Sequence, residues 1–279
     1  MMAFIHWDIN PQIFPDFEYL RWYGLFWAIG ILLAIQVMQH LYKKEGFAIA
    51  DLDKLVIYLI LGIIIGARFG HILFYDPVYY WHNPIEILPI SLKPGFHFTG
   101  LAGLASHGGV LGGLLALYLY TRKYKKDFLW ILDRLVIVGP LLGGFIRLGN
   151  LMNSEILGTP TQLPWAFVFS RIDLVPRHPA QLYEAIFYLL TSLILCKMWK
   201  SRKWQEHKGF LFGMGFTLIF VQRFLIEFVK EDQVAFEGSL WLNMGQTLSL
   251  FMIAFGIGLM FWSQKSTRPL KHRKESSVG

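Results

Sequence analysis

The chain has 279 residues, of which 54% are hydrophobic and only 16% are charged. A soluble protein of this length would need more charge on its surface, so we expect an integral membrane protein. The formal net charge of +7 comes from basic residues that cluster between apolar runs, which indicates membrane topology and excludes a nucleic-acid-binding module. The single cysteine, Cys196, excludes an internal disulfide and a cysteine-pair metal site, and we expect it to be a buried helix residue.

The first twenty residues contain three acidic side chains and no Lys or Arg, so we expect no cleaved signal peptide. Seven stretches are apolar enough and long enough to cross a membrane, which takes about 20 helical residues. They are residues 23–41, 55–73, 104–120, 131–148, 182–199, 209–229 and 244–262. We therefore predict an all-α polytopic membrane protein with seven transmembrane helices, formed by one domain over residues 1–264 and followed by a basic cytoplasmic tail over residues 265–279.

The basic residues of the connecting segments predict the orientation. Seventeen Lys and Arg lie in segments 42–54, 121–130, 197–208 and 263–279, whereas five lie in segments 1–22, 74–103, 149–181 and 230–243. By the positive-inside rule the first set is cytoplasmic, so we expect the N-terminus outside and the C-terminus in the cytoplasm. The long external segments 74–103 and 149–181 are rich in Pro and aromatic residues, and we expect ordered caps or short interfacial helices there.

Three arginines lie in the outer halves of the predicted spans: Arg68, Arg147 and Arg223. An ionised arginine in hydrocarbon costs about 3 kcal/mol, so such residues need an anion or a carboxylate. Glu155 and Glu227 can offset part of the charge, and the excess stays positive. The ligand best suited to a site with two arginine guanidinium groups is a phosphate, and at this depth the commonest phosphate is a phospholipid headgroup.

A structural role competes with binding at each of these positions. Arg68 is explained equally well by snorkelling or an ion pair, because it stands in a row of small residues that suits close helix packing, Gly62, Gly66 and Gly70. For Arg147 and Arg223 we favour binding. Arg147, Asn150 and Ser154 have the spacing of one helix face, which predicts a shared polar surface there.

Two histidines accompany these arginines. His107 is followed by Gly108, Gly109, Gly112 and Gly113, which we expect to leave the imidazole uncovered so that a substrate chain can approach. A hydrogen-bonded packing role is the alternative for a histidine in a membrane. His178 lies in the polar entry to the fifth span, residues 177–184, where a loop-anchoring role is about as well supported as catalysis.

The sequence lacks a zinc-binding His-Glu-x-x-His helix, a Gly-x-Ser-x-Gly elbow, a Walker loop and an acidic cluster, so we predict neither a metal nor a cofactor. The main alternative to an enzyme is a transporter for a small anion or a lipid. Such a protein needs polar residues along the full depth of a pathway, whereas the cytoplasmic halves of these spans are nearly free of charge. A non-catalytic scaffold leaves the arginines unexplained.

The run from Arg147 to Gly158, RLGNLMNSEILG, closely resembles the signature of the bacterial prolipoprotein diacylglyceryl transferases. The similarity covers almost the whole chain and includes residues 21–25, 66–68, 107–109, 177–184, 223–227 and 244–246. The resemblance implies a seven-span enzyme of the inner membrane with its active site toward the outer leaflet. Its reaction moves the diacylglyceryl group of phosphatidylglycerol to the thiol of the lipobox cysteine of a preprolipoprotein, which forms a thioether and releases glycerol 1-phosphate.

Carried over by position, the resemblance implies a set of site residues. Arg147 matches the family's phosphatidylglycerol-binding arginine, Arg223 its second essential arginine and His107 the proposed base. The catalytic residues expected on this basis are Tyr23, His107, Arg147 and Arg223. The residues expected to bind substrate are Arg68, Arg147, Asn150, Glu155, Gly158, His178, Arg223 and Glu227.

The chain departs from the family pattern at three positions. Ile146 stands where a glycine is usual before the arginine, and Leu151 stands where a phenylalanine is usual. Lys230 stands where an arginine is common, which keeps the charge and loses the two-pronged geometry. Ile146 implies slightly looser packing beside Arg147 and removes no reacting group.

Overall fold

The computed structural model describes residues 4–14, 20–88, 90–91, 95–98, 103–201, 204, 206–231 and 242–265. The chain forms two compact units, one of residues 1–40 with 129–279 and the other of residues 41–128. The predicted basic tail lies outside the described residues from residue 266 onward.

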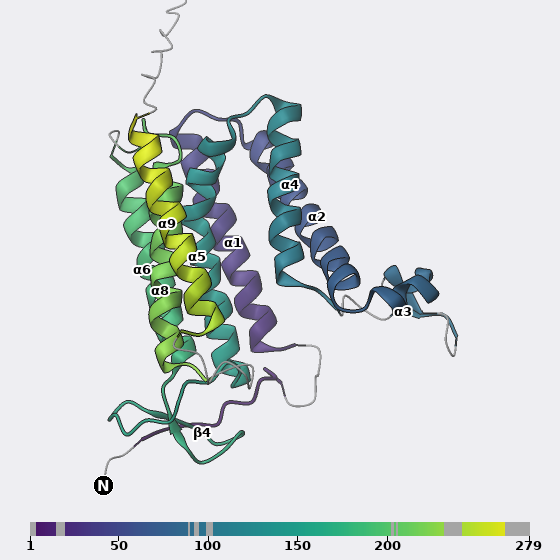
Figure 1. Cartoon of the computed structure of the whole chain (residues 1–279), viewed down its shortest axis with the longest axis vertical. Helices are drawn as coiled ribbons and strands as arrows, with labels where there is room; N and C mark the ends of the chain where they lie inside the picture. Colours follow the sequence, from purple (N-terminus) through teal and green to yellow (C-terminus); the bar gives the residue numbers. More distant parts are fainter. Residues whose placement is uncertain are drawn as a thin grey trace, which may run out of the picture. The chain divides into compact units, whose positions relative to one another are not determined.

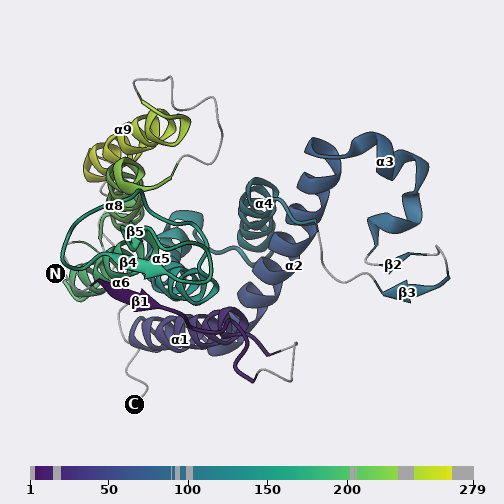
Figure 2. The ribbon, with the colours of Figure 1, turned by 90° about the horizontal axis from the view of Figure 1, so that it is seen from below.

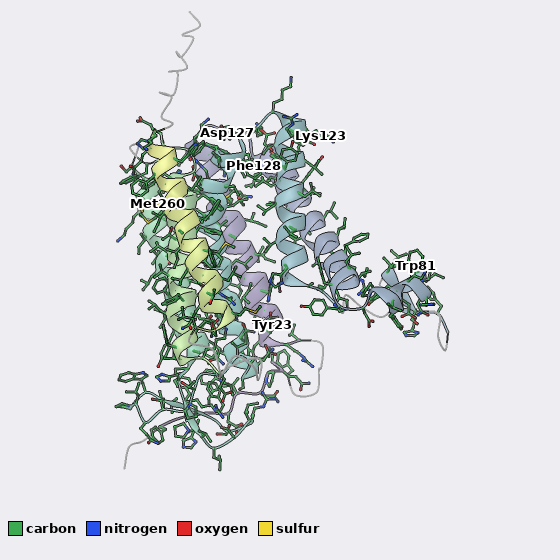
Figure 3. All side chains as sticks on the ribbon, in the orientation of Figure 1. Tyr23, Trp81, Lys123, Asp127, Phe128 and Met260 are labelled. Atoms are coloured by element: carbon green, nitrogen blue, oxygen red, sulfur yellow. The ribbon has the colours of Figure 1, made fainter. Side chains whose placement is uncertain are left out.

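The first unit is a bundle of five long helices: α1 (Trp22–Lys44), α5 (Phe128–Asn153), α6 (Ala180–Trp199), α8 (Phe210–Ile226) and α9 (Met244–Lys265). Helix α8 contacts both α6 and α9, and it continues into the short 3-10 helix η2 (Glu227–Val229). Helices α5 and α8 end, and α1, α6 and α9 begin, at the same end of the bundle (Figure 1). Tyr23 lies at this end, whereas Met260 lies at the opposite end (Figure 3).

Small residues let these helices approach closely. A Cβ atom on Gly213 of α8 would lie 2.8 Å from the Gly256 carbonyl oxygen of α9, and one on Gly144 of α5 would lie 2.9 Å from Leu189 of α6. The Ser192 hydroxyl of α6 also donates to the Ile137 carbonyl of α5 at 2.7 Å. Close packing of this kind is the main attraction between helices in lipid, because the hydrophobic effect does not drive their association there.

A buried carboxylate joins α5 to the start of α8. Asp133 accepts hydrogen bonds from the backbone amides of Gly209 at 2.7 Å and Phe212 at 2.8 Å. These amides belong to the first turn of a helix, where the backbone N–H groups lack partners within the helix. The negative charge also interacts favourably with the helix dipole.

A small three-stranded sheet lies over α5 and α6 at the end of the bundle where α6 begins (Figure 2). Strand β1 (Ile5–Trp7) pairs in parallel with β4 (Phe167–Phe169), which pairs in antiparallel fashion with β5 (Pro176–Arg177). Leu151, Phe167 and Phe169 form a buried core beneath it. We expected ordered caps or short interfacial helices in segment 149–181; the segment forms strands β4 and β5 instead of helices, and the all-α prediction missed these short strands.

The second unit contains the helix pair α2 (Ile49–Phe74) and α4 (Ser106–Tyr124). Its external segment forms α3 (Pro77–His82), η1 (Pro84–Ile87) and the hairpin of β2 (Ile90–Ser91) with β3 (His97–Phe98). The short helices agree with the helical segments predicted here. Trp81 of α3, labelled in Figure 3, is 85% exposed.

The glycines of α2 and α4 pack directly against one another. A Cβ atom on Gly66 would lie 2.4 Å from the Gly108 carbonyl oxygen, and one on Gly62 would lie 2.7 Å from the Gly112 carbonyl oxygen. The prediction that the α2 glycines serve close packing is confirmed. We expected Gly108 and Gly112 to leave the His107 imidazole uncovered so that a substrate chain can approach. The α2 backbone fills the space beside both glycines, so they serve helix packing, while His107 itself is exposed.

Six of the described helices are long and apolar enough to cross a membrane, and they span residues 22–44, 49–74, 128–153, 180–199, 210–229 and 244–265. Together they make the chain a multi-pass membrane protein. The third of the seven predicted spans forms the 19-residue helix α4, which is not among these six. Cys196 lies in α6 and is partly buried.

Candidate active site

Arg147 lies in the last two turns of α5, and two groups fix its guanidinium. Its Nε lies 2.8 Å from Oε2 of Glu184, and its Nη1 donates to Oδ1 of Asn150 at 3.3 Å. Glu184 is only 3% exposed. Separating the two partners of a buried ion pair is costly, because it leaves an uncompensated charge. The pair with Glu184 therefore holds Arg147 in one orientation.

Asn150 links Arg147 to Glu155. Its amide donates to Oε2 of Glu155 at 3.0 Å, and the Asn153 amide donates to Oε1 at the same distance. The Gln181 amide donates to the Glu155 backbone carbonyl. The sequence analysis gave Glu155 as the carboxylate that offsets Arg147, but the ion pair is with Glu184, and Glu155 reaches Arg147 through Asn150.

The end of α5 explains this arrangement. The amide of Glu155 donates to the Asn150 carbonyl, and the amide of Ser154 donates to the Leu151 carbonyl, the two bonds of a Schellman motif. Ser154 takes the left-handed conformation with φ of +55°. Arg147 and Asn150 therefore share a helix face as predicted, whereas Ser154 lies beyond the helix and is not on that face.

Arg223 lies one turn before the end of α8, with its side chain 44% exposed. Its Nη2 lies 3.7 Å from Oε1 of Glu227, and the Asn243 amide donates to Oε2 of Glu227 at 3.1 Å. Asn243 and Gln246 exchange side chain to backbone hydrogen bonds in a capping box at the start of α9. The N-terminus of α9 thus fixes Glu227, which faces Arg223.

Lys230 follows η2 and is only 7% exposed. A backbone bridge joins it to Gly158, and the Thr159 amide donates to the Val229 carbonyl at 2.9 Å. A Cβ atom on Gly158 would lie 2.3 Å from the His178 carbonyl oxygen, so only glycine fits at this crossing. Burial lowers the pKa of Lys230, while Glu184 and Glu227 act in the opposite direction.

These observations define a charged cluster at the end of the bundle where α5 and α8 end. Its five members are Arg147, Glu184, Arg223, Glu227 and Lys230, and the charges of the other four act on both Glu184 and Lys230. The cluster contains three basic and two acidic side chains. The sequence analysis expected an excess of basic groups from a different set, in which Arg68 and Glu155 stood in place of Lys230 and Glu184. An excess of basic groups suits an anionic ligand.

Two members of the charged cluster were missed by the sequence analysis. Gln181, Glu184 and Tyr188 have the spacing of one helix face within an apolar span, and this polar face could have indicated Glu184. Lys230 is the first residue after the sixth predicted span, in the external connection 230–243, which holds no other basic residue. A lone cation on the external side is the signal that could have indicated it.

Tyr23, in the first turn of α1, packs against α5 beside the charged cluster. A Cβ atom on Gly149 would lie 2.8 Å from Cδ2 of Tyr23, so the ring lies against the backbone next to Asn150. The structure thus brings Tyr23, Asn150 and Arg147 to the same part of the bundle.

Residues 177–184 include side chains that anchor loops as well as Glu184, a member of the charged cluster. Arg177 pairs with Asp173 at 2.6 Å and with Glu231, and this pairing lowers the pKa of the Asp173 carboxyl group. Nδ1 of His178 lies 3.3 Å from the Tyr183 hydroxyl, which accepts a hydrogen bond from Trp165 at 2.8 Å. Burial lowers the pKa of His178.

Arg68 and His107 belong to the second unit. The Arg68 guanidinium donates to three backbone carbonyls of the external segment and lies 5.1 Å from the Tyr80 ring; the carbonyls are those of Glu86, Ile87 and Gly103. It therefore holds this segment against the end of α2. His107 lies exposed in the first turn of α4.

Within the described ranges of the chain, no group of three or more His, Cys, Asp and Glu side chains is placed to hold a metal ion. The charged cluster contains two guanidinium groups and one ammonium group, which are the side-chain groups that bind phosphate.

Comparison with known proteins agrees with this chemistry. The sequence model of the prolipoprotein diacylglyceryl transferase family matches residues 12–262. The chain belongs to the prolipoprotein diacylglyceryl transferase family. Members of this family named phosphatidylglycerol–prolipoprotein diacylglyceryl transferase include one from Bacteroides fragilis, which is 47% identical over 269 residues, 95% of this chain and 97% of the relative.

Two further members carry the same name. The relative from Tolumonas auensis is 46% identical over 265 residues, 94% of this chain and 98% of its own length. The relative from Chloroherpeton thalassium is 42% identical over 269 residues, which cover 95% of this chain and 97% of the relative. Similarity to transferases over nearly the whole chain does not favour the transporter alternative.

Proposed function

We propose that this protein is a transferase that moves the diacylglyceryl group of phosphatidylglycerol to the thiol of the lipobox cysteine of a preprolipoprotein, the first step of lipoprotein maturation. Its family and the name shared by its relatives support this function. The observation that carries the chemistry is that Arg147, paired with Glu184, and Arg223, paired with Glu227, both lie at the end of the bundle where α5 and α8 end (Figure 1). Two arginines at one place are suited to hold the phosphate of a lipid headgroup.

The reaction is a displacement at a saturated carbon. Sulfur forms a bond to the glyceryl carbon, the bond from that carbon to the phosphate oxygen breaks, and the oxygen keeps the electron pair. Negative charge therefore grows on the phosphate, where Arg147 and Arg223 stabilise it. The attacking sulfur must be a thiolate, because the thiol is a weak nucleophile, and His107 is our candidate for the base that takes its proton.

Other residues support the substrate. Tyr23 and Asn150, next to each other at the end of α5, orient headgroup hydroxyls or phosphate oxygens. Glu155 acts through Asn150, and Glu227 acts through Arg223. Gly158 and His178 shape the loop over the charged cluster. The contacts of Arg68 support a positioning role in the external segment, which competes with the binding role expected from its place in the outer half of a span.

The topology proposed for this function has seven spans, with α4 as the seventh. At 19 residues α4 is about 28 Å long, close to the hydrocarbon thickness of about 30 Å. The N-terminus lies outside, the C-terminus lies in the cytoplasm, and the charged cluster faces the outer leaflet of the bacterial inner membrane, because the connections at its end are poor in Lys and Arg. The exposed Trp81 suits the headgroup zone.

The direct test is to incubate the purified protein with phosphatidylglycerol and a lipobox peptide and to weigh the peptide by mass spectrometry. We expect the peptide to gain one diacylglyceryl group on its cysteine while glycerol 1-phosphate appears in equal amount. A matched peptide with serine in place of the cysteine should stay unmodified. Unchanged cysteine peptide, with phosphatidylglycerol bound or moved across the bilayer, would instead support the transporter alternative.

A further inference from the structure

Three buried oxygen atoms around Glu155 form no hydrogen bond with any residue that the structure describes. They are Oδ1 of Asn153, Oγ of Ser154 and Oε1 of Gln181. Ser154 is 4% exposed and Gln181 is 0% exposed. A buried polar atom without a partner destabilises the folded protein, and nearly all such atoms in proteins are paired. Three of them in one region indicate a ligand that supplies the missing hydrogen bonds.

The three side chains belong to one small region, because each adjoins Glu155. The Asn153 amide donates to Oε1 of Glu155 at 3.0 Å, and the Gln181 amide donates to the Glu155 backbone carbonyl. Ser154 precedes Glu155 in the chain. In both amide side chains the nitrogen faces an oxygen of Glu155, so the carbonyl oxygen is the atom left for a donor. We call Asn153, Ser154 and Gln181 the acceptor group.

The backbone on both sides of Glu155 is strained. Ser154 has φ of +55° and Ile156 has φ of +58°, in the left-handed region that glycine adopts most easily. Strain of this kind persists only where the surrounding structure imposes it, and it is concentrated at functional sites. A serine in this conformation with an unpartnered hydroxyl adds neither a favourable backbone nor a hydrogen bond to the fold. A role in stability therefore does not explain Ser154.

Hydrogen bonds connect the acceptor group to Arg147 through Glu155 and Asn150. Asn150 accepts from Arg147 at 3.3 Å and donates to Oε2 of Glu155 at 3.0 Å. Under the proposed function, on which this inference rests, Arg147 holds the phosphate of phosphatidylglycerol. The two hydroxyls of that headgroup lie on the two carbon atoms that follow the phosphate ester. They are uncharged donors, whereas a cationic donor would be repelled by the Arg147 guanidinium.

We propose that the acceptor group binds the hydroxyls of the lipid headgroup and thereby selects a hydroxylated headgroup. A site built to pair with a hydroxyl rejects an analogue that lacks it, because the buried polar atoms of the site then stay unpaired. The same hydroxyls belong to the glycerol phosphate that departs. The acceptor group therefore also holds the leaving group while sulfur displaces it.

The first experiment compares two lipids with the unaltered protein in neutral detergent, at a saturating concentration of lipobox peptide. Phosphatidylglycerol and phosphatidylpropanol with the same acyl chains have the same charge and the same number of headgroup carbons, and the second lacks both hydroxyls. We expect kcat/KM for phosphatidylglycerol to be at least about 100-fold higher. Values within about threefold of each other would overturn the proposal without any variant being needed.

The second experiment repeats this comparison with Ser154→Gly and Gln181→Met, each of which removes one oxygen of the acceptor group. The preference for phosphatidylglycerol should fall by about tenfold in each variant. Ser192→Ala is the matched control, because it also removes a buried serine hydroxyl, but one that donates to the Ile137 carbonyl at 2.7 Å. Its preference should equal that of the unaltered protein.

Stability separates binding from a structural role. Ser154→Gly should raise the thermal unfolding midpoint, because glycine adopts a positive φ without strain. A serine that only ends the helix would give a changed midpoint with an unchanged preference. Oxygens that bind the backbone amides of the peptide would give variants in which both lipids react more slowly by the same factor. An unchanged preference in both variants, from either cause, overturns the proposal.

The outcomes also separate this inference from the proposed function. Equal transfer from the two lipids by the unaltered protein overturns the role of the acceptor group and leaves the transferase function in place. Transfer from neither lipid to the lipobox peptide overturns the proposed function itself.

Discussion

Two arginines at the ends of apolar helices have very different surroundings. Arg68 donates to three backbone carbonyls of the external segment and lies over an aromatic ring. Arg147 is bonded to a buried carboxylate and an amide, within a charged cluster in which basic side chains outnumber acidic ones. The first arginine joins two parts of the chain, while the second is fixed in place where an anion can bind. The sequence places both at similar depth, and only their partners separate the two roles.

The largest effect is expected at Arg147. Lysine keeps the charge but cannot bond Glu184 and Asn150 through a rigid fork, so Arg147→Lys should lower diacylglyceryl transfer by at least about 100-fold. The measurement is the initial rate of lipobox-peptide modification by equal amounts of protein in membranes. Arg171→Lys, on an exposed loop, should leave the rate unchanged. A rate for Arg147→Lys within about threefold of the unaltered protein would contradict the phosphate role.

The next effect is expected at His107, which is exposed at the start of α4. If its imidazole takes the thiol proton, His107→Gln should lower the transfer rate by about 100-fold, because general base catalysis contributes at least that much. The thermal unfolding midpoint should stay the same, since the side chain is not part of the core. A variant that keeps most of its activity would remove His107 as the base.

Arg68 should give a smaller effect on activity and a clear effect on structure. Arg68→Gln loses most of the bonds to the external segment, which should cost about 1–3 kcal/mol of unfolding free energy. Limited proteolysis should cut residues 76–104 faster, and transfer should fall by less than about tenfold. A loss of activity as large as that of Arg147→Lys, with unchanged proteolysis, would instead place Arg68 among the phosphate-binding residues.

The smallest effect is expected at His178, where burial lowers the pKa below its ordinary value of about 6.5. Below that pH the unfolded chain binds the proton more readily than the folded protein, so stability is present above about pH 6.5 and is lost as pH falls. His178→Gln should weaken this dependence. The thermal unfolding midpoints of both proteins at pH 7.5 and pH 5.5 measure it, and equal decreases in the two proteins would contradict the assignment.

Much of the helical architecture could be predicted from the lengths of the apolar runs, because spanning helices need long runs of hydrophobic residues. The predicted sixth span, residues 209–229, corresponds to α8 and η2 together, and the row Gly62, Gly66 and Gly70 lies at the predicted helix contact. The small sheet could not be predicted, because β1 and β4 each have three residues and lie about 160 positions apart in the chain.

The candidate site was predictable in part. The spacing of Arg147 and Asn150 on α5 gave their shared face, and both lie there. The partner of Arg147 could not be read from spacing along α5, because Glu184 comes from another helix. The packing role of the glycines after His107 was missed, since the sequence does not show that α2 fills the space beside Gly108 and Gly112.

The most direct test of the phosphate role is an experimental structure of the protein with phosphatidylglycerol bound. We expect phosphate oxygens within hydrogen-bond distance, about 2.7–3.2 Å, of guanidinium nitrogens of both Arg147 and Arg223. A phosphate held by Arg68, or by only one of those two arginines with the other turned away, would contradict the account.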